Sequence, residues 1–190
     1  QGGILLKWFR DTFASGEGAG GSSGGSGGGS IFTKLLDEMP EGPSPVSVLP
    51  HLTTTGPPDF LEKTSGLISG LTIDTSRGDI CKGILEGVAF YLKENLDNLP
   101  GGMKIDEFTV VGGGSKSDTW MQMTADILNR PCRRTGEAEA GSLGAAILAA
   151  VGAGRYKDVF EAAEKMVEYG RVFVPAADNE KYSNNYRRYK

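Results

Sequence analysis

Apolar residues recur along this chain with the period of a helix, and the longest regular run lies between residues 77 and 98. Every fourth position in this run is apolar: Ile80, Ile84, Val88, Leu92 and Leu96. Side chains at this spacing lie on one face of an α-helix. Ser76, followed three residues later by Asp79, resembles a capping box that starts a helix, and the sequence PGG at residues 100–102 stops it. The pattern therefore predicts a helix that ends at Asn98.

Shorter segments have the patterns of further helices and of strands. Helices are predicted over residues 3–13, 31–39, 142–151, 158–168 and 178–189, with another after residue 117. In the first of these, the apolar face consists of Ile4, Leu5, Trp8 and Phe9. Strands are predicted over residues 46–49, 67–73, 107–111 and 132–135. Strands that alternate with helices indicate an α/β domain.

Residues 16–30 have the sequence GEGAGGSSGGSGGGS and contain no side chain that buries much apolar area. Chains of this composition are flexible coils. An engineered linker that replaces a natural loop explains the near-pure Gly/Ser content, and a natural low-complexity insert is the alternative. The segment divides the chain into a first helix within residues 1–15, a linker at 16–30 and a remainder over residues 31–190.

The composition suits a packed domain, because 38% of the residues are hydrophobic and 23% are charged. No run approaches the roughly 18 apolar residues of a membrane-spanning helix, so no membrane partner is expected. The net charge is −4, which argues against nucleic-acid binding because a phosphate backbone requires a basic face. The local basic excess at Arg130, Arg133 and Arg134 is interpreted as solvated surface.

The use of cysteine and histidine excludes several kinds of site. Cys81 and Cys132 are far apart without metal-ligand spacing, and His51 is the only histidine. A histidine-rich metal site therefore cannot be built from this chain, and we predict no metal-ligating residues. Unpaired cysteines are typical of a reduced, cytoplasmic protein. Because the chain begins with Gln1 and no signal-peptide pattern follows, we expect a fragment or processed product of a longer protein.

The sequence GGGSKS at residues 112–117 is the strongest candidate for chemistry. It directly follows the strand predicted over residues 107–111 and precedes a helix that Ser115 or Ser117 can cap. A glycine-rich turn at this place lets a ligand approach the backbone, and the amide groups at a helix start favour anions. The segment matches neither the P-loop nor the GxGxxG pattern, so a tight turn without a ligand is the alternative from these residues alone.

Residues 112–156 (GGGSKSDTWMQMTADILNRPCRRTGEAEAGSLGAAILAAVGAGRY) resemble the carboxyl-terminal lobe of the FGGY carbohydrate kinases. This family includes xylulokinases, gluconate-type kinases and glycerol kinases. Residues 66–86 (GLISGLTIDTSRGDICKGILE) resemble a second family signature, with Gly83 where the family has Ala or Ser. GPPDF at residues 56–60 and GGILLKWFRD at residues 2–11 resemble family segments in the expected order. The resemblance covers nearly the whole chain outside residues 16–30.

The resemblance implies an actin-like ATPase (ribonuclease H-like) domain of the α/β class, namely the carboxyl-terminal lobe of a sugar kinase without its first strands. In this family the lobe holds the adenosine side of ATP. By motif position, the nucleotide contacts fall on Gly113, Gly114 and Ser117 in the loop, and on Gly3 and Lys7 in the first helix. Ser117 stands where glycerol kinases have asparagine, and Lys7 where they have glutamine. Lys7 is interpreted either as a phosphate contact or as a solvated lysine.

The same resemblance implies that the catalytic aspartate, the phosphate-binding loop and most sugar contacts belong to an amino-terminal portion that this chain lacks. No catalytic residue is therefore predicted, and the base is not assigned to any of Asp59, Asp74, Asp79 and Asp118. Gly144, Ala145 and Ala146 are interpreted as small residues that permit close helix packing. Two departures, TGPPDF at residues 55–60 and Ser65, disfavour a glycerol kinase and leave a xylulokinase-like enzyme or another sugar kinase of uncharacterised specificity.

From these features the chain is expected to be the part of a xylulokinase-like carbohydrate kinase that binds ATP or ADP. The whole enzyme is expected to transfer the γ-phosphoryl group of Mg-ATP to a sugar or polyol hydroxyl, and this part alone to be inactive. The alternatives are an isolated nucleotide-binding module and a structural fragment without activity. A homo-oligomer is left open, because a stripe of tyrosines packs either on its own domain or on a partner: Tyr182, Tyr186 and Tyr189.

Overall fold

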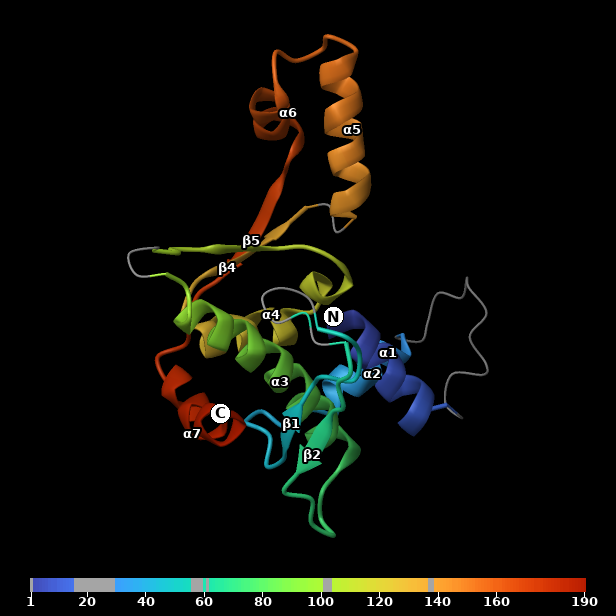
Figure 1. The fold of residues 1–190 in the computed structure, drawn as a ribbon, viewed down its shortest axis with the longest axis vertical. Coiled ribbons are helices and arrows are strands. Elements are labelled where there is room, and N and C mark those ends of the chain that lie inside the picture. The colour runs from blue at the N-terminus through green and yellow to red at the C-terminus, as the bar shows by residue number, and fades with distance from the viewer. Residues whose placement is uncertain (1, 16–29, 56–59, 61, 101–103, 137–138) are drawn as a thin grey trace. The chain divides into compact units, whose positions relative to one another are not determined.

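The structure is a computed structural model that describes residues 2–15, 30–55, 60, 62–100, 104–136 and 139–190 of the chain. The chain folds into two compact units (Figure 1). The first unit comprises Gln1–Met103, Asp126–Leu128 and Ala177–Lys190, and the second comprises Lys104–Ala125 and Asn129–Ala176. Strands and helices are present in both units, as expected of an α/β protein.

The first unit is organised around its longest helix, α3 (Arg77–Asp97). Four elements contact this helix: α1 (Gly2–Phe13), α2 (Ile31–Asp37), strand β1 (Ser47–Leu49) and α7 (Ser183–Tyr189). Strand β1 pairs in antiparallel fashion with β2 (Leu67–Ser69), so that Val48 lies opposite Ile68. A 3₁₀ turn, η2 (Asn179–Tyr182), precedes α7. The core of this unit therefore lies between α3 and the elements around it.

Helix α3 begins where the sequence predicts it. The Ser76 hydroxyl accepts a hydrogen bond from the Asp79 amide at 3.1 Å, and the Asp79 carboxylate accepts one from the Ser76 amide at 2.8 Å. This capping box satisfies amide groups that the first turn of a helix leaves without partners. The buried surface differs from the predicted stripe, of which only Ile84 is buried and Leu92 is 40% exposed, since the helix has neighbours on several sides. It includes Cys81, Ile84, Leu85, Ala89 and Phe90.

Glycines bring the backbone of α3 close to β1. A Cβ atom at Gly83 would lie 3.0 Å from methyl groups of Val46 and Val48. A Cβ atom at Gly87, one turn further along, would lie 2.4 Å from the Val48 carbonyl oxygen. The second distance is too short for any carbon atom, so the helix can pack at this separation only with glycine at position 87.

Two charged residues of α3 are buried among these contacts. Glu86 is 1% exposed and accepts hydrogen bonds from the Ser44 amide at 2.7 Å and from Asn185 Nδ2 at 3.0 Å. Lys82 is 3% exposed and donates from Nζ to the carbonyl oxygens of Pro40 and Glu41, at 2.6 and 3.1 Å. Burial raises the pKa of Glu86 to about 7, although both hydrogen bonds and the Lys82 charge oppose this shift.

Helix α1 confirms the helix predicted over residues 3–13, but the expected apolar face is wrong in part. Leu5, Leu6 and Phe9 are buried, whereas Ile4 is 55% and Trp8 is 37% exposed. Three consecutive apolar residues at positions 4–6 make the apolar stripe wide, and contact with α2 and α3 selects one side of it. The strand predicted to reach residue 73 is also shorter, because β2 ends at Ser69.

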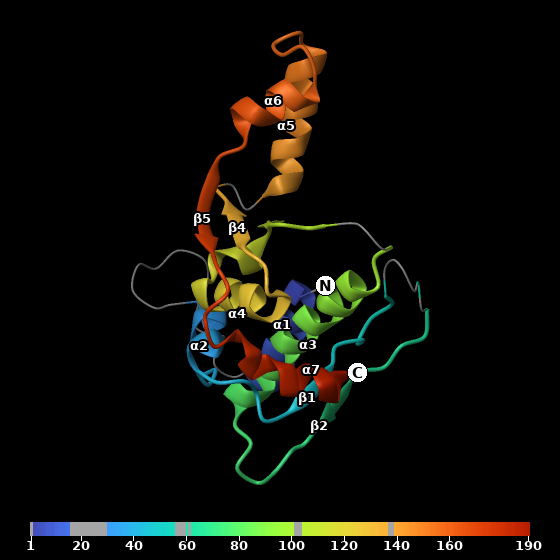
Figure 2. The same cartoon turned by 90° about the vertical axis from the view of Figure 1, so that its left-hand side faces the viewer.

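The C-terminal tyrosines pack on their own unit, where α7 lies against α3 (Figure 2). Tyr182 and Tyr189 are buried, and the Tyr186 hydroxyl donates a hydrogen bond to Asp97 at 2.7 Å. The ring centroid of Phe90 lies 5.6 Å from that of Tyr186 and 5.7 Å from that of Tyr189. Of the two interpretations of the tyrosine stripe, packing on its own domain is confirmed.

The second unit contains a three-stranded sheet in the order β3 (Phe108–Val110), β4 (Cys132–Thr135) and β5 (Tyr169–Phe173). Strands β3 and β4 are parallel and are joined through helix α4 (Asp118–Leu128), as a parallel crossover requires. Strand β5 runs antiparallel to β4 and was not predicted. Its sequence, YGRVF, is interrupted by Gly170 and Arg171, and most of it is exposed.

Helices α5 (Ala140–Gly152) and α6 (Val159–Met166) lie side by side in the second unit (Figures 1 and 2). Helix α5 is rich in alanine and leucine, yet none of its residues is buried. No heavy atom of the described chain lies within 4 Å of a Cβ placed on Gly144, and Ala145 and Ala146 are exposed. The close helix packing expected at these three residues is therefore absent from the described part of the chain.

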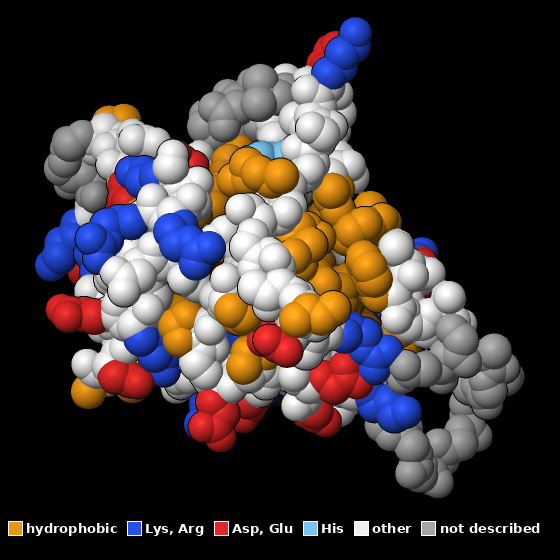
Figure 3. Space-filling view, turned by 90° about the horizontal axis from the view of Figure 1, so that it is seen from below, with side chains coloured by type: hydrophobic (Ala, Val, Ile, Leu, Met, Phe, Trp, Pro, Cys, Tyr) orange, Lys and Arg blue, Asp and Glu red, His pale blue; other side chains and the backbone are white. Residues whose placement is uncertain are grey.

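Large apolar side chains of the first unit are also exposed, among them Phe60, Leu67, Leu71 and Ile73. Figure 3 shows one face of the molecule, on which hydrophobic side chains gather in the middle and charged ones lie mostly towards the edges. Apolar groups that lie together in this way are typical of surfaces that meet another part of a protein. The described residues leave this surface uncovered.

Substitution of the two glycines that face β1 is expected to have unequal effects. In Gly83→Ala, the new methyl group displaces valine methyls by tenths of an ångström, and the higher helix propensity of alanine offsets this cost. The free energy of unfolding is therefore expected to stay within about 1 kcal/mol of the native value. In Gly87→Ala, the methyl group meets a backbone carbonyl and lowers the free energy of unfolding by about 1–3 kcal/mol. Urea unfolding of both variants measures this difference, and equal losses would contradict it.

The raised pKa of Glu86 predicts a pH dependence of stability. The folded state holds its proton up to about pH 7, whereas an ordinary glutamate loses it near 4.5. The stabilisation by protonated Glu86 is therefore complete below pH 4.5 and is lost as the pH rises through 7, by roughly 1–3 kcal/mol. Glu86→Gln is expected to remove this part of the slope in urea unfolding across that range. The exposed-site control Glu180→Gln is expected to retain it, and a retained slope in Glu86→Gln would contradict the assignment.

Candidate functional site

The glycine-rich segment forms a compact loop between β3 and α4 in the second unit. Gly112 has φ +91° and ψ 178°, a conformation that favours glycine, and residues Gly113–Lys116 form the 3₁₀ turn η1. Ser115 is 2% exposed and closes the turn, because its amide and its hydroxyl both donate to the Gly112 carbonyl oxygen, at 3.0 and 2.7 Å. The loop therefore has a defined shape that its own hydrogen bonds maintain.

Gly113 and Gly114 have different surroundings. Among the residues that the structure describes, no heavy atom beyond the neighbours of Gly113 in the chain lies within 4 Å of a Cβ placed on it, and the residue is exposed. A Cβ on Gly114 would lie 2.9 Å from the ring of Trp120. Gly113 thus presents open backbone to solvent, whereas Gly114 lies flat against an aromatic ring. Another molecule can approach the backbone closely at Gly113.

Ser117 starts helix α4, which settles the choice between the two candidate caps. Its hydroxyl accepts a hydrogen bond from the Trp120 amide at 3.2 Å, and its own amide donates to the Gly114 carbonyl oxygen at 3.2 Å. Ser115 is instead part of the turn before the helix. The first turn of α4 directs its backbone amides and the positive end of its dipole towards the loop side, where an anion is favoured.

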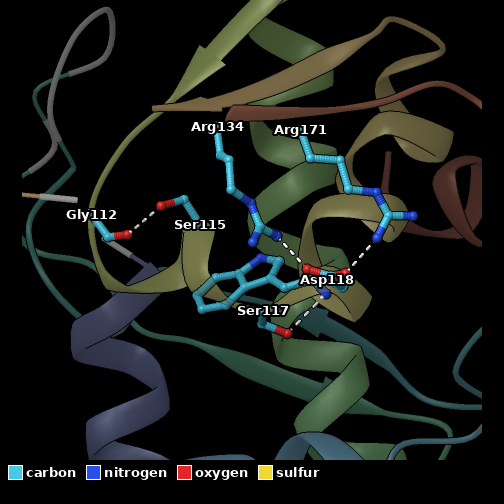
Figure 4. A network of polar contacts seen from close by, with 7 residues as sticks. Gly112, Ser115, Ser117, Asp118, Arg134 and Arg171 are labelled. Carbon is cyan, nitrogen blue, oxygen red and sulfur yellow. Dashed lines mark hydrogen bonds and ion pairs between the residues drawn. The ribbon is translucent and has the colours of Figure 1, made fainter. Parts of the chain in front are cut away.

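Asp118, the first residue of α4, is held by two arginines from the sheet (Figure 4). Its carboxylate accepts from Arg134 of β4 at 2.5 Å and from Arg171 of β5 at 2.6 Å. The guanidinium carbons of both arginines lie over the ring of buried Phe173, at 4.9 and 4.6 Å from its centroid. The carboxylate of Asp118 therefore makes two ion pairs with the sheet, while its side chain remains 56% exposed.

The basic cluster lies at the surface, as interpreted, since Arg130 is exposed and Arg133 and Arg134 are partly exposed, but its arginines also bind neighbouring groups. Arg133 forms a two-pronged ion pair with Glu107 at 2.7 and 3.0 Å, and this holds the pKa of the Glu107 carboxyl below its usual range. Arg130 donates from Nε to the Ile105 carbonyl oxygen at 3.0 Å. Sequence reasoning missed Arg134 and Arg171 because neither lies near Asp118 in the chain, and no local pattern marks such a pairing.

Gly3 and Lys7 belong to the first unit, on α1. Both are exposed and stand one helical turn apart, so they share a face of this helix. No heavy atom lies within 4 Å of a Cβ placed on Gly3. The five predicted nucleotide contacts thus fall in two groups, Gly3 with Lys7 in the first unit and the three loop residues in the second.

The part of the chain that the structure describes offers no metal site of acidic, histidine or cysteine side chains, no membrane-spanning helix and no reactive cysteine. That part contains no group of three or more His, Cys, Asp or Glu side chains placed to hold a metal ion. Its helices include none with the length and apolar character needed to cross a membrane. Burial raises the pKa of the Cys81 thiol to about 12 and of the Cys132 thiol to about 11, so neither is a reactive thiolate. Asp59 and most of the GPPDF segment lie outside the described residues.

Comparison with known proteins identifies the family. Residues 2–153 match the profile of the FGGY family of carbohydrate kinases, C-terminal domain. The chain belongs to this family. The resemblance of its motifs to FGGY kinases is thereby confirmed, and the fold is that of an actin-like ATPase domain, as expected for the carboxyl-terminal domain of an FGGY kinase.

Individual FGGY relatives support the same assignment. A xylulose kinase of Bacillus subtilis (strain 168) is 30% identical over 193 residues, which cover 99% of this chain and 36% of that protein. A glycerol kinase of Enterococcus casseliflavus is 34% identical over 152 residues, or 79% of this chain and 30% of that protein. The crystal structure of ligand-bound xylulose kinase from Lactobacillus acidophilus matches with a TM-score of 0.77 and 25% identity, over 98% of this chain and 36% of that one. The chain spans about a third of the length of these FGGY proteins.

The loop geometry predicts that neighbouring glycines respond differently to alanine. Gly112→Ala places a side chain at φ +91° and is expected to lower the free energy of unfolding by about 1–2 kcal/mol. Gly113→Ala adds a methyl group in open space and is expected to change it by less than about 0.5 kcal/mol. Urea unfolding followed by circular dichroism compares the two variants. A large loss of stability in Gly113→Ala would show that this backbone is not open.

Proposed function

We propose that this chain is the ATP-binding carboxyl-terminal part of a carbohydrate kinase that transfers the γ-phosphoryl group of ATP to a sugar or polyol hydroxyl. Membership of the FGGY family supports the reaction class. The observation that carries the nucleotide site is the open backbone at Gly113, in a loop of defined shape at the start of α4. Such a surface accepts a flat or polar ligand without displacing any side chain.

Within this proposal, Gly113 and Gly114 present backbone to the adenosine part of the nucleotide, and the Ser117 hydroxyl lies at the next helix start. Gly114 contributes through its close packing on the Trp120 ring, which supports the backbone of the loop. Gly3 offers a second open backbone surface on α1, and the exposed Lys7 ammonium on the same face suits a phosphate group. These five residues bind and orient ATP or ADP, and none of them takes part in proton transfer.

The remaining chemistry is assigned to parts of the protein outside this chain. No acidic cluster among the described residues fits Mg²⁺. Magnesium is therefore proposed to be held by the nucleotide phosphates and by carboxylates of the amino-terminal portion, as is common for kinases. An aspartate of that portion would accept the proton of the sugar hydroxyl. Because this chain spans about a third of its relatives, we expect it to bind nucleotide but not to phosphorylate a sugar alone.

A five-carbon ketose is the proposed substrate class. A xylulose kinase matches nearly the whole chain, whereas the glycerol kinase match covers 79% of it. Ser65 and the TGPPDF segment also depart from the glycerol kinase pattern. We place the enzyme in the cytoplasm, where the buried, unpaired Cys81 and Cys132 stay reduced. The described residues contain no contact that assigns an oligomeric state, and homo-oligomerisation is not part of the proposal.

Calorimetric titration of the chain with ADP and with Mg-ATP tests the nucleotide site. Saturable binding is expected for the native chain, and Gly113→Val is expected to weaken it at least tenfold, about 1.4 kcal/mol, because the side chain fills the surface proposed for the ligand. Gly152→Val is the matched control, since Gly152 is an equally open glycine of the second unit. Unchanged binding by Gly113→Val would place the nucleotide elsewhere. Absence of binding by the native chain would contradict a site formed by this chain alone.

A further inference from the structure

The glycine loop packs on β4 and on Trp120, and its hydrogen bonds lie within it or at its end on α4. The hydrogen bonds shown for its residues join Ser115 to Gly112 and Ser117 to Gly114 and to the first turn of α4. These bonds fix the internal shape of the loop but not its position over the sheet. That position depends on packing against β4 and Trp120 and on the two ends of the loop, where β3 enters it and where α4 leaves it.

Asp118 fixes the second of these ends to two different strands. It follows Ser117 directly, and its carboxylate oxygens accept separately from Arg134 and Arg171 (Figure 4). Because Arg134 lies on β4 and Arg171 on β5, the start of α4 is tied to the sheet at two points. A carboxylate held from two directions can neither translate nor rotate freely, and the adjoining Ser117 moves with it.

The two arginines are themselves held in place. Both guanidinium groups lie over the ring of Phe173, which is 2% exposed. The stem of Arg134 also crosses β5 at Gly170, where a Cβ atom would lie 2.9 Å from Arg134 Cγ. Stacking on a fixed ring and close passage over the strand restrict the rotamers of these long side chains. The network therefore couples the position of the loop to that of the sheet.

A second ion pair of the same unit provides a contrast. Arg133, the neighbour of Arg134 on β4, binds both carboxylate oxygens of Glu107, and the two side chains are each 35% exposed. This pair joins β4 to the residue before β3 and, within the described chain, does not involve residues 112–118. It has the same chemistry as the Asp118 network, in which Asp118 is 56% and Arg171 64% exposed, without the connection to the loop.

We infer that Asp118, Arg134 and Arg171 are positioning residues of the nucleotide site, which hold the start of α4 so that the backbone at Gly113 and Gly114 meets the ligand. The inference rests on the proposed nucleotide binding. Without these contacts the start of α4 moves more freely, so that the loop samples other positions over the sheet and its internal hydrogen bonds open more often. The network touches no reacting atom, and its effect falls on nucleotide affinity rather than on the sugar.

The test measures ADP affinity and amide hydrogen exchange in the full chain for Asp118→Asn, Arg171→Ala and the control Arg133→Ala. The first two variants are expected to weaken ADP binding about tenfold and to speed exchange at the Ser115 and Ser117 amides. The double variant that combines Asp118→Asn with Arg171→Ala is expected to bind ADP no more weakly than the weaker-binding single variant, because the two residues act through one contact. Arg171→Lys, which keeps the charge, is expected to recover part of the loss. Arg133→Ala is expected to bind as the native chain does.

The outcomes separate this inference from the proposed function. If the native chain binds ADP and Gly113→Val does not, while Asp118→Asn and Arg171→Ala bind normally, the positioning role is overturned and the nucleotide site stands. Equal losses in Arg133→Ala and Arg171→Ala would also overturn it, because any ion pair of the unit would then have the same effect. If the native chain binds no nucleotide, both proposals are overturned. Circular dichroism of each variant shows whether the fold is retained.

Discussion

The first unit depends on the buried carboxylate of Glu86, because three separate chain segments meet on it. Ser44 and Asn185 lie 42 and 99 positions away in the sequence, and both donate hydrogen bonds to Glu86 on α3. A carboxylate at 1% exposure is tolerated only where donors replace its water. The contact therefore requires that the segment before β1 and helix α7 both stay in place, and the close approach of α3 to β1 at Gly87 follows from the same arrangement.

Local signals predicted the helices of this fold well, but not the contacts that join them. The capping box at Ser76 and the four-residue apolar repeat specify α3 from neighbouring residues alone. The repeat does not mark Lys82 and Glu86 as buried, and they are buried because α3 has neighbours on several sides. Strand β5 went unpredicted for a related reason. Its pairing with β4 places Gly170 and Arg171 in a strand that their own propensities do not favour.

The candidate site likewise combines features that local sequence predicts with contacts between distant residues that it does not predict. The glycine loop, the strand before it and the cap at Ser117 follow from residues next to one another, and the structure places all of them as the sequence indicated. The Asp118 network joins residues 16 and 53 positions apart, and no periodicity links them. Arg134, interpreted from the sequence as solvated surface, is thus part of the support for the loop. The assignment of Gly3, Lys7, Gly113, Gly114 and Ser117 as nucleotide contacts stays a prediction.

An open glycine can be a binding element only when its surroundings are rigid. Gly113 has no side chain and no close neighbour, so any contact it makes with a ligand comes from backbone atoms that no rotamer change can adjust. The backbone must already be in position before the ligand arrives, which avoids an ordering cost on binding. The positive φ of Gly112, the turn closed by Ser115 and the ring of Trp120 next to Gly114 supply the shape. The arginines on Asp118 supply the position, which explains why an ion pair one residue beyond the loop bears on what the loop can bind.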